Sequence, residues 1–563
     1  MKVRTVAVLI GASLLLVVTG ATALAQGPNP PPAPQGMTTA SAPLTVRTNV
    51  GPIAGIDPSF SSWYTPPAMF VVNQLFAGLV RADEVTGEPL PELASGWASS
   101  PNASVFTFTL RSGLKWSDGS TLTADDAKRG FLRGLRSDPG GDITFMLDII
   151  QNARGWATGA VTDPDLLGVR VLDSTHLVIT CTGPAAYLPS VLTVAPARPV
   201  PGAVIDANGV PTWTLPAYII TSGAYRLLAW TDGVSMTLQK SPDYYDAANV
   251  QIDRVELAML SDDAAWTAYQ VGQLDTALVP AAAWTAALAD PELQPQLHAS
   301  PRIGTQWASF NTTKAPMDNL LVRQAFAAAI DRQNVVLASG LGGGETPAVT
   351  FTPPGSFGHV DGVAEGIGFP YNPVQARSLL AQAGYTNGVG LPAITFLSNA
   401  DANHAVIEAL QQSWFSTLSV SVTVVYTERS QYYSALRDDP PQMWSGRWMY
   451  DYPDAYNFLH DPMDWVGSPQ QAGHWSNAIY NYLVNVAAQT ADLETRKVLY
   501  RLAEKILVET DMAMAPVYYM GNGFATRVNL QRDYGRGGWD SRVAAWRISW
   551  RAYLPLVLRL VGT

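Results

Sequence analysis

Apolar and polar residues alternate along several short segments in the first half of the chain. From Phe106 to Leu110 every second residue is large and apolar, and threonines stand between them, which predicts a half-buried β-strand. An Asp118-Gly119 pair then predicts a turn. Thr123, with Asp126 three residues later, marks the start of a helix. The stretch 104–136 is therefore expected to fold as strand, turn and helix.

Two other stretches predict β-hairpins, because strand-like segments flank a short turn at Asp173-Ser174 and again at Asp232-Gly233. In the second half, apolar residues recur at helical spacing in three places: 319–337, 373–383 and 491–510. The segments "ITFLSN" and "VSVTVVYTE" between these helices predict strands. Strands and helices thus alternate in the second half, which indicates an α/β fold.

The first residues have the pattern of a secretory signal peptide. Lys2 and Arg4 precede the apolar run Val6–Val18, and Ala23-Leu24-Ala25 in front of Gln26 forms an A-x-A cleavage site. The run is shorter than the roughly 20 residues that span a bilayer, and an uncleaved anchor helix is the alternative interpretation. The segment "GPNPPPAPQG" that follows predicts an extended spacer.

The only cysteine is Cys181, so no lipid-modified cysteine can follow the cleavage site and no internal disulfide can form. Its neighbourhood, "HLVITCTG", predicts a strand with a buried thiol. Loss of Lys2 and Arg4 with the signal takes the formal charge from −11 to about −13, and an acidic exported protein is a poor candidate for binding nucleic acid. The six histidines have no close ligand spacing and predict no metal site.

Two short motifs remain. The glycine-rich "GLGGGE" at 340–345 lacks the spacing of a phosphate-binding loop and predicts a flexible loop instead. The stretch "RWMYDYPDAYNFLHDP" from Arg447 to Pro462 sets Asp451 and Asp454 among aromatic residues, in a chain with only 14% charged residues. A carboxylate in such surroundings needs a cation or several donors, supplied by the protein or by a ligand. Asp454 is expected to serve a turn or a helix cap.

Several segments, in their order along the chain, resemble the extracytoplasmic solute-binding proteins that serve ABC importers of peptides, the oligopeptide- and dipeptide-binding family (family 5). The most recognisable is "LPELASGWASSPNASVFTFTLRSGLKWSDGSTLTADDAKRGF" at 90–131. The others are "SGAYRLLAW" (222–230), "SPDYYDAANVQIDRVEL" (241–257), "FNTTKAPMDNLLVRQAFAAAIDRQNVV" (310–336), "FTPPGS" (351–356), "LLAQAGY" (379–385) and "APVYYM" (515–520). Each segment alone is explained by packing, but their shared order is hard to obtain by chance.

The resemblance implies an α/β fold of the two-lobed, periplasmic-binding-protein-like kind (type II, the large class with an extra subdomain). Its lobes are joined by a hinge that the chain crosses twice, and they close over a ligand. The expected parts are a signal peptide (1–25), a Pro-rich linker (26–43), a first lobe (44–80, 212–300 and 505–550), an inserted subdomain (81–211), a second lobe (301–504) and a C-terminal tail (551–563). The tail lies beyond the resemblance, and it is expected either to dock on the lobe or to help retain the protein at the cell surface.

The resemblance also implies a binding strand. In oligopeptide-binding relatives an aspartate in a strand reading "W..DY" holds the free α-amino group of the peptide, and the matching residue here is Asp451. An ammonium group with three donors suits a carboxylate in a dry, aromatic cleft. The main chain of this strand pairs with the ligand as an added β-strand would, at Arg447 and Met449, with Trp448 and Tyr450 beside them.

Weaker parts of the resemblance place further ligand contacts across the cleft and near the hinge: Ser62, Trp63, Tyr64, Arg437 and Tyr519. Two positions depart from the family. Ser430 replaces a usual tryptophan, and Arg447 stands where small residues are common. These departures indicate a wider or differently charged pocket.

The leading hypothesis is thus a non-enzymatic, monomeric receptor outside the cytoplasm, with no cofactor, that passes a peptide to a membrane permease. An alternative keeps the receptor and changes the cargo to an oligosaccharide or another small solute, because aromatic rings also stack on sugars. An exported hydrolase is a distant alternative, since Asp451 and Asp454 are three residues apart and face opposite sides of an extended strand.

Overall fold

The computed structural model describes residues 43–59, 65–137, 144–193, 195–340, 343–464, 475–532 and 542–548. The predicted signal peptide, most of the Pro-rich linker and the C-terminal tail lie outside these residues, as do Ser62, Trp63 and Tyr64. Within the described ranges, no helix is both long enough and apolar enough to cross a membrane.

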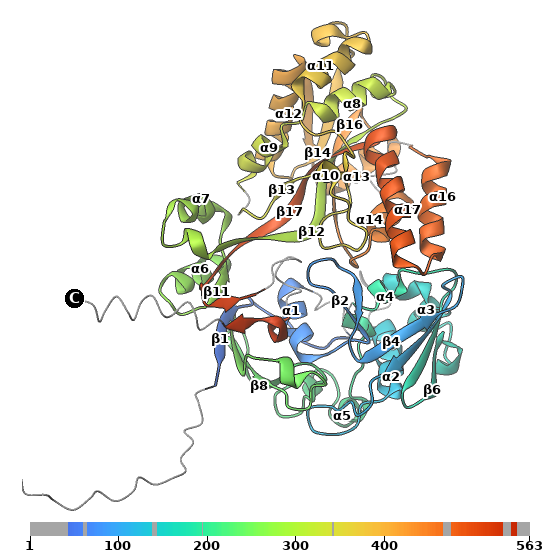
Figure 1. Cartoon of the computed structure of the whole chain (residues 1–563), viewed down its shortest axis with the longest axis vertical. Coiled ribbons are helices and arrows are strands. Elements are labelled where there is room, and N and C mark those ends of the chain that lie inside the picture. The colour runs from blue at the N-terminus through green and yellow to red at the C-terminus, as the bar shows by residue number, and fades with distance from the viewer. Residues whose placement is uncertain are drawn as a thin grey trace, which may run out of the picture. The chain divides into compact units, whose positions relative to one another are not determined.

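One mixed sheet of 11 strands runs through the described part of the chain (Figure 1). Its order is β15-β14-β16-β12-β17-β11-β1-β10-β9-β8, and β13 pairs with β17 beside this path. The strands are β1 (Thr45–Asn49), β8 (Tyr225–Thr231), β9 (Ser235–Lys240), β10 (Arg254–Ala258), β11 (Thr276–Leu278), β12 (Leu297–Phe310), β13 (Thr346–Pro347), β14 (Ile394–Asn399), β15 (Val422–Thr427), β16 (Met443–Met449) and β17 (Met514–Thr526).

A separate four-stranded antiparallel sheet, ordered β4-β5-β7-β6, lies within the predicted inserted subdomain, whose boundaries stay a prediction. Two further sheets have two strands each. The strands of these sheets are β2 (Val80–Ala82), β3 (Pro89–Pro91), β4 (Ala94–Ser99), β5 (Val105–Leu110), β6 (Val169–Asp173), β7 (His176–Thr180), β18 (Leu530–Gln531) and β19 (Arg547–Ile548).

Helices pack around both sheets (Figure 1). They are α1 (Pro66–Leu75), α2 (Ala124–Ser137), α3 (Ala153–Thr158), α4 (Leu188–Val191), α5 (Gly202–Asn208), α6 (Asp262–Gln270), α7 (Ala281–Ala289), α8 (Leu320–Ala328), α9 (Arg332–Ser339), α10 (Gly362–Glu365), α11 (Pro373–Gln382), α12 (His404–Leu418), α13 (Arg429–Asp438), α14 (Tyr456–Leu459), α15 (Asp461–Asp464), α16 (Ala478–Gln489) and α17 (Leu493–Lys505).

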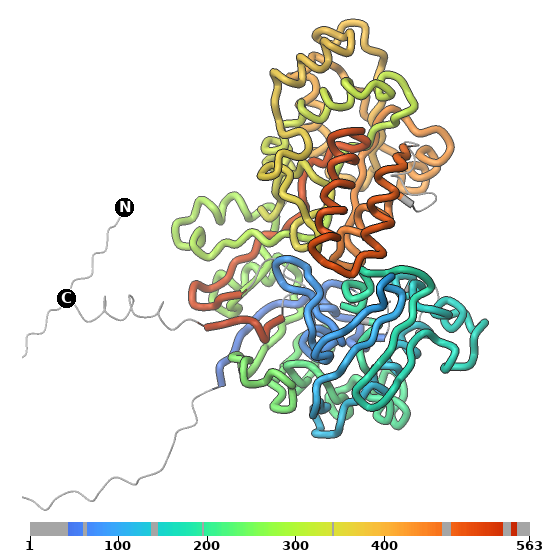
Figure 2. The backbone as a smooth tube through the Cα atoms, turned by 45° about the vertical axis from the view of Figure 1, so that its right-hand side comes forward, coloured from blue at the N-terminus to red at the C-terminus, as the bar shows by residue number. Residues whose placement is uncertain are grey.

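The two longest strands join the two lobes (Figure 2). The far end of β12 pairs with β16 through residues 304–310, whereas the far end of β17 pairs with β11 through residues 524–526. Each strand therefore begins in one half of the large sheet and ends in the other, and the chain crosses between the lobes twice. The pairing of β12 with β17 is irregular between Pro301 and Thr305.

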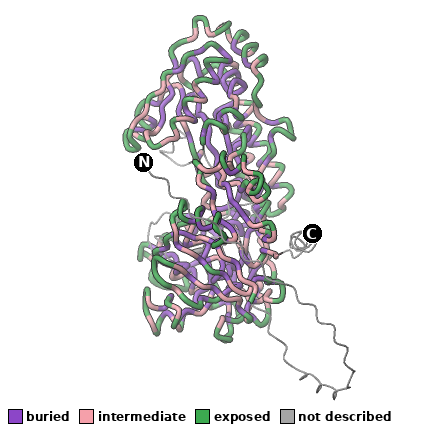
Figure 3. The backbone as a smooth tube through the Cα atoms, turned by 90° about the vertical axis from the view of Figure 1, so that its left-hand side faces the viewer, coloured by how far each residue is buried: buried purple, intermediate pink, exposed green. Residues whose placement is uncertain are grey.

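Each half of the large sheet has its own apolar core. Figure 3 shows buried backbone in the interior of both halves, with exposed segments around it. In the second lobe the fully buried Trp414 of α12 packs on Phe326 of α8 and on Phe396 of β14, each at a ring-centroid distance of 5.6 Å. Burial of such large rings is the main source of stability for the layer of helices over the sheet.

Most of the local predictions are confirmed. The stretch 104–136 folds as β5, a turn and α2, and both hairpins form, as β6–β7 and β8–β9. The backbone N–H of Thr123 donates to the Asp126 carboxylate at 2.8 Å, which closes the start of α2. Cys181 is buried, and burial raises the pKa of its thiol to about 12. The helix predicted at 373–383 is α11, capped by Asn372.

One predicted helix is wrong as drawn, because the stretch 319–337 forms two helices, α8 and α9, with a break at Ala329–Asp331. The Asp331 side chain accepts from the backbone N–H of Asn334 and so starts a new helix. The next residue, Arg332, is buried and donates to the carbonyl oxygens of Ala348 and Pro516, at 2.7 and 2.8 Å. These tertiary bonds fix the break, which the apolar stripe alone does not reveal.

Candidate ligand-binding site

The edge of strand β16 is the central feature of the site. β12 pairs with β16 along its whole length, whereas β14 pairs with it only at Met443 and Trp444. Within the described part of the chain, no strand pairs with residues 445–449 on that second side. The backbone N–H of Tyr450 donates to the Ile303 oxygen of β12 at 3.0 Å. Because antiparallel pairs alternate, the backbone groups of residues 447 and 449 point to the unpaired side.

Asp451 lies two residues beyond the end of β16 and is half-buried. The buried side chain of Asn457 brackets it: Asn457 Oδ1 accepts from the Asp451 backbone N–H, and Asn457 Nδ2 donates to Asp451 Oδ2, both at 2.9 Å. Asn457 Nδ2 also donates to Asp461 Oδ2 at 2.9 Å. The Asp451 carboxylate is therefore held in one orientation by the side-chain amide of Asn457.

Asp454 has a different role from Asp451, because it is fully buried and paired inside the protein. Its Oδ2 accepts from Arg496 Nη2 at 2.8 Å and from Ser190 Oγ at 3.1 Å, and its Oδ1 accepts from Tyr500 Oη at 3.1 Å. It also accepts from the backbone N–H of Tyr456, two residues later, so of the predicted turn or cap it is the turn that forms, before α14. A carboxylate so engaged is not placed to act with Asp451 across a substrate bond.

The aromatic residues around these carboxylates form a stack. Tyr187 of the region before α4 lies over Tyr456 with ring centroids 4.1 Å apart, and Tyr456 lies over His460 at 4.3 Å. Tyr452 donates its hydroxyl to Asp461 Oδ2 at 2.8 Å. This stack joins residues of the 447–462 stretch to a distant segment of the chain, and the aromatic surroundings of Asp451 stay a prediction.

A cavity of about 950 Å³ opens on β16, a volume typical of ligand sites. It is lined by residues of both lobes, with Leu278 and Val279 from the first lobe and residues 445–449 from the second. The lining also contains three arginines and four acidic residues: Arg302, Arg429, Arg447, Asp262, Asp263, Glu345 and Asp401. The site therefore combines an unpaired strand edge with a mixed-charge surface.

Burial shifts the pKa of several groups in this cavity, among them Glu345 and Arg302. Burial raises the pKa of Glu345 to about 7, although backbone N–H groups and the charge of Arg302 act in the opposite direction. Burial lowers the pKa of Arg302, and the like charge of Arg447 lowers it further. Both groups are thus less well solvated in the site than in water.

The predicted site residues fall into three groups. Arg447, Trp448 and Met449 line the cavity, whereas Tyr450 and Asp451 follow directly after them and are not among its lining residues. Arg437 is exposed on α13, bound to its neighbour Asp438 at 3.0 Å, and Tyr519 is buried with its hydroxyl bonded to Thr350; neither lines the cavity. The remaining predicted residues, Ser62, Trp63 and Tyr64, lie outside the described part of the chain.

Sequence reasoning missed Arg302, Glu345 and Tyr518. A signal for Glu345 was present in the glycines before it. A Cβ on Gly344 would come within 2.0 Å of the backbone nitrogen of Asn522, and one on Gly521 within 1.8 Å of the Gly344 oxygen. The glycines therefore let two backbones touch and carry Glu345 into the cavity, so the described part of "GLGGGE" is packed and not a free loop.

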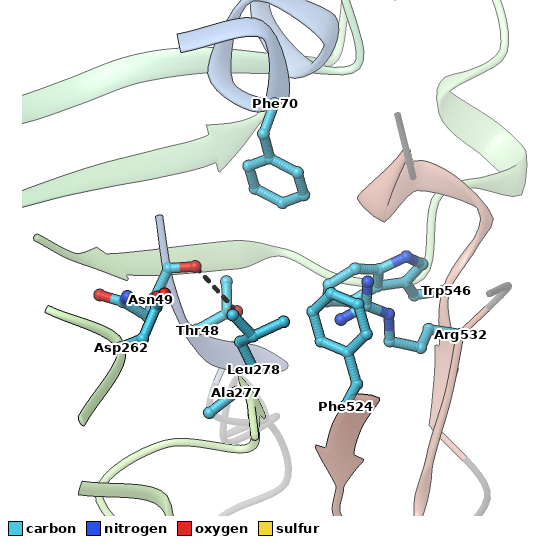
Figure 4. Close-up of a pocket in the computed structure, with 9 residues that line it drawn as sticks. All are labelled: Thr48, Asn49, Phe70, Asp262, Ala277, Leu278, Phe524, Arg532 and Trp546. Atoms are coloured by element: carbon cyan, nitrogen blue, oxygen red, sulfur yellow. Dashed lines mark hydrogen bonds between the residues drawn. The ribbon is translucent and has the colours of Figure 1, made fainter. Parts of the chain in front are cut away.

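A second cavity is too small for such a role. Its volume is about 20 Å³, room for about one water molecule. Figure 4 shows Arg532 between the rings of Phe524 and Trp546, and the guanidinium carbon lies 4.5 and 4.8 Å from their centroids. Phe70 of α1 lies on the opposite side. This cluster attaches the last described segment to the first lobe.

Comparisons with known proteins identify the family. Residues 88–468 match the model of the bacterial extracellular solute-binding proteins, family 5. The chain belongs to this family. Among its members, the probable deoxycholate-binding periplasmic protein YgiS of Escherichia coli is 31% identical over 80% of this chain and 83% of its own length. The oligopeptide-binding protein OppA of Bacillus subtilis is 28% identical over 82% of this chain and 85% of its own.

The fold agrees with this family assignment. The unliganded open form of the murein tripeptide-binding protein MppA matches with a TM-score of 0.81 at 27% identity, over 92% of this chain and 99% of that protein. The expected two-lobed α/β architecture of family 5 is thus confirmed. The family 5 relatives named here are binding proteins and not enzymes.

Proposed function

We propose that this chain is an extracytoplasmic receptor that captures peptides and delivers them to the membrane permease of an ABC importer. The observation that carries the proposal is the edge of β16, where the backbone groups of Arg447 and Met449 face a cavity of ligand size without a strand partner among the described residues. An extended peptide can add itself there as a further strand, and recognition through main-chain hydrogen bonds accepts many side chains.

The Asp451 carboxylate then binds the free α-amino group at one end of that peptide. Asn457 holds the carboxylate in place before the ligand arrives, so little order is lost on binding. Trp448 and Tyr450 flank the strand end and pack partly against the main apolar core. Exclusion of water by these rings strengthens an ammonium–carboxylate contact.

The proposal extends to where the protein works. Export by the signal peptide 1–25 leaves a mature chain that begins at Gln26 and has no cysteine for lipid attachment. The receptor acts as a monomer without a cofactor or enzymatic activity.

A second candidate cargo has some support. One relative is named as a probable deoxycholate-binding protein. Deoxycholate is an amphipathic bile acid that has a carboxylate but no peptide main chain to pair with β16, and the strand edge therefore favours peptides. An oligosaccharide stacked on the aromatic residues is the other alternative.

Isothermal titration with trialanine, N-acetyl-trialanine and the variant Asp451→Asn tests the proposal. Acetylation of the peptide and loss of the carboxylate are each expected to weaken binding by about 3 kcal/mol, roughly 100-fold, because each leaves one charge without its partner. The two changes together are expected to weaken binding no further than either alone.

Asp438→Asn is the matched control, since Asp438 is an exposed carboxylate on α13 whose side chain is 66% accessible. Its affinity for trialanine should equal that of the unchanged protein. Equal affinities for the free and acetylated peptides would show that the α-amino group is not recognised by Asp451.

A further inference from the structure

Two arginines of the cavity, the half-buried Arg302 and the exposed Arg447, differ from the more deeply buried arginines of the protein. Arg323, Arg332 and Arg496 each donate to carbonyl or carboxylate oxygens. In contrast, Arg302 and Arg447 line the cavity, and within the described ranges neither guanidinium has a hydrogen-bond acceptor or an ion-pair partner. For the half-buried Arg302 this is costly, because burial removes its donors from water without supplying an acceptor, whereas the exposed Arg447 keeps its donors open to the cavity.

The two arginines lie close enough to sense each other's charge, since Arg447 lowers the pKa of Arg302. The register explains how they meet. Gln306 of β12 stands opposite Arg447 of β16 and opposite Tyr518 of β17, and paired residues of antiparallel strands project to the same face. Arg302 lies in the irregular part of β12, between Pro301 and Thr305.

Glu345 does not neutralise this pair. No ion pair within 4.0 Å joins it to either arginine in the described part of the structure, and its Oε2 is buried without a hydrogen-bond partner. The backbone N–H groups of Gly344, Glu345 and Gly521 favour the charged form of its carboxylate and so lower its pKa, against the larger effect of burial. Two guanidinium groups and one carboxylate leave a net positive cluster, and this cluster becomes more positive when Glu345 takes up a proton.

We propose that Arg302 and Arg447 bind a carboxylate group of the ligand, and that Glu345 makes this binding dependent on pH. The inference rests on the proposed peptide-receptor function and narrows its cargo to peptides that place an acidic side chain or a C-terminal carboxylate beside β16. Guanidinium groups suit this task because they bind carboxylates through two parallel hydrogen bonds. Tyr518 of β17 also lines the cavity, where its hydroxyl can donate a further hydrogen bond to the carboxylate.

The direction of the pH effect follows from the groups around Glu345. The charge of Arg302 on β12 acts on Glu345, and Glu345 in turn affects the pKa of Tyr518 on β17. Arg447 on β16 lowers the pKa of Tyr518. The indole of Trp284 from α7 lies beside Gly343. A ligand carboxylate between the arginines repels the charged form of Glu345 and raises its pKa above about 7. Binding therefore takes up a proton, and carboxylate affinity rises as pH falls toward about 7, by up to about tenfold per pH unit, and levels off below about 7, where Glu345 is already protonated in the free protein.

The test is calorimetric titration of the purified chain with matched peptides. One arm compares trialanine amide carrying Glu with the same amide carrying Gln, at each position in turn. The other compares trialanine as free acid and as amide, which separates an acidic side chain from a C-terminal carboxylate as the recognised group. One arm is expected to show a preference of about tenfold or more for the carboxylate form.

Three variants assign that preference. Arg302→Met and Arg447→Met are each expected to remove it, whereas Arg437→Met, at an exposed arginine outside the cavity, leaves it unchanged. Glu345→Gln mimics the protonated acid, so the preference should persist and lose its dependence on pH. Ratios between matched peptides cancel the titration of the peptide's own amino group, and thermal unfolding of each variant verifies that it folds.

The outcomes are separable. If all peptides bind with equal affinity, or if a peptide carrying Lys binds more tightly than the matched peptide carrying Glu, the proposed carboxylate site is wrong. The receptor function then still stands. If no peptide binds at all, the receptor proposal fails and this inference falls with it. A carboxylate preference that survives both arginine substitutions also overturns the assignment.

Discussion

Asp454 and Arg496 show how a charged side chain can serve structure alone. Their side chains are 0% and 1% accessible, and they lie 2.8 Å apart. Burial opposes the charged state of Arg496, but the nearby Asp454 and Tyr500 raise its pKa above the ordinary value. Arg496 also donates to the carbonyl oxygen of Ala186, so it ties α17 to the region before α4.

Substitution Arg496→Met is expected to lower the free energy of unfolding by about 3–5 kcal/mol, because it leaves Asp454 buried without its cation. Urea unfolding followed by circular dichroism measures the change. The exposed Arg437, changed to Met in the same way, should shift stability by no more than about 0.5 kcal/mol. A double variant, Asp454→Leu with Arg496→Met, is expected to recover most of the loss, and equal destabilisation in single and double variants would contradict this account.

At the scale of elements, strand β16 combines two functions in seven residues. Its first two residues, Met443 and Trp444, pair with both neighbours and anchor it in the sheet. From Ser445 onward it pairs only with β12. Proteins usually protect the edges of their sheets from other chains. Here the change from two strand partners to one leaves an unpaired edge inside a large sheet.

This arrangement predicts a pattern in a peptide ligand whose amide nitrogens are methylated one at a time. Only alternate residues of an added strand turn their N–H toward β16, and therefore methylation should weaken binding at every second position. The loss at a pairing position is expected to be about 1 kcal/mol, roughly fivefold. The intervening positions serve as internal controls for the bulk of the methyl group, and equal losses along the whole peptide would argue against strand addition.

The sequence was informative about elements and less so about the site. Alternation and capping residues gave the order of β5 and α2, both hairpins and α11, because these depend on local chemistry. The break after Ala328 escaped prediction because it is fixed by bonds from Arg332 to distant carbonyl groups. Glu345 and Arg302 were missed for a similar reason: their importance arises from strand neighbours far away in the chain.

Family resemblance pointed to β16 as the binding strand, which stays a prediction, but gave less help with its surroundings. Arg447 was recognised as a departure, and the structure places it on the cavity beside Arg302. The proposed contact at Asp451 stays a prediction, as do those at Ser62, Trp63 and Tyr64. Residues carried over singly, such as Arg437 and Tyr519, lie away from the lining, because a shared motif does not fix the side-chain positions around it.

At the scale of the whole molecule, ligand binding to the folded state should raise stability by mass action. A peptide at 100 times its Kd is expected to stabilise the protein by about 2.7 kcal/mol, which differential scanning fluorimetry detects as a higher Tm. Deoxycholate and a neutral oligosaccharide at the same concentration should leave Tm unchanged. If Tm rises with either of these solutes and does not rise with peptides, that solute class and not peptides is the ligand of the receptor.

The ribbon of β12 and β17 has one more consequence. These strands are the joint between the lobes, and they also supply Arg302, Gln306 and Tyr518 to the cavity wall. In the proposed receptor, a ligand bound by these side chains is bound by the strands that connect the lobes. A twist of the ribbon that separates the lobes also moves these three side chains out of alignment. Opening of the lobes and release of the ligand to the importer then occur together.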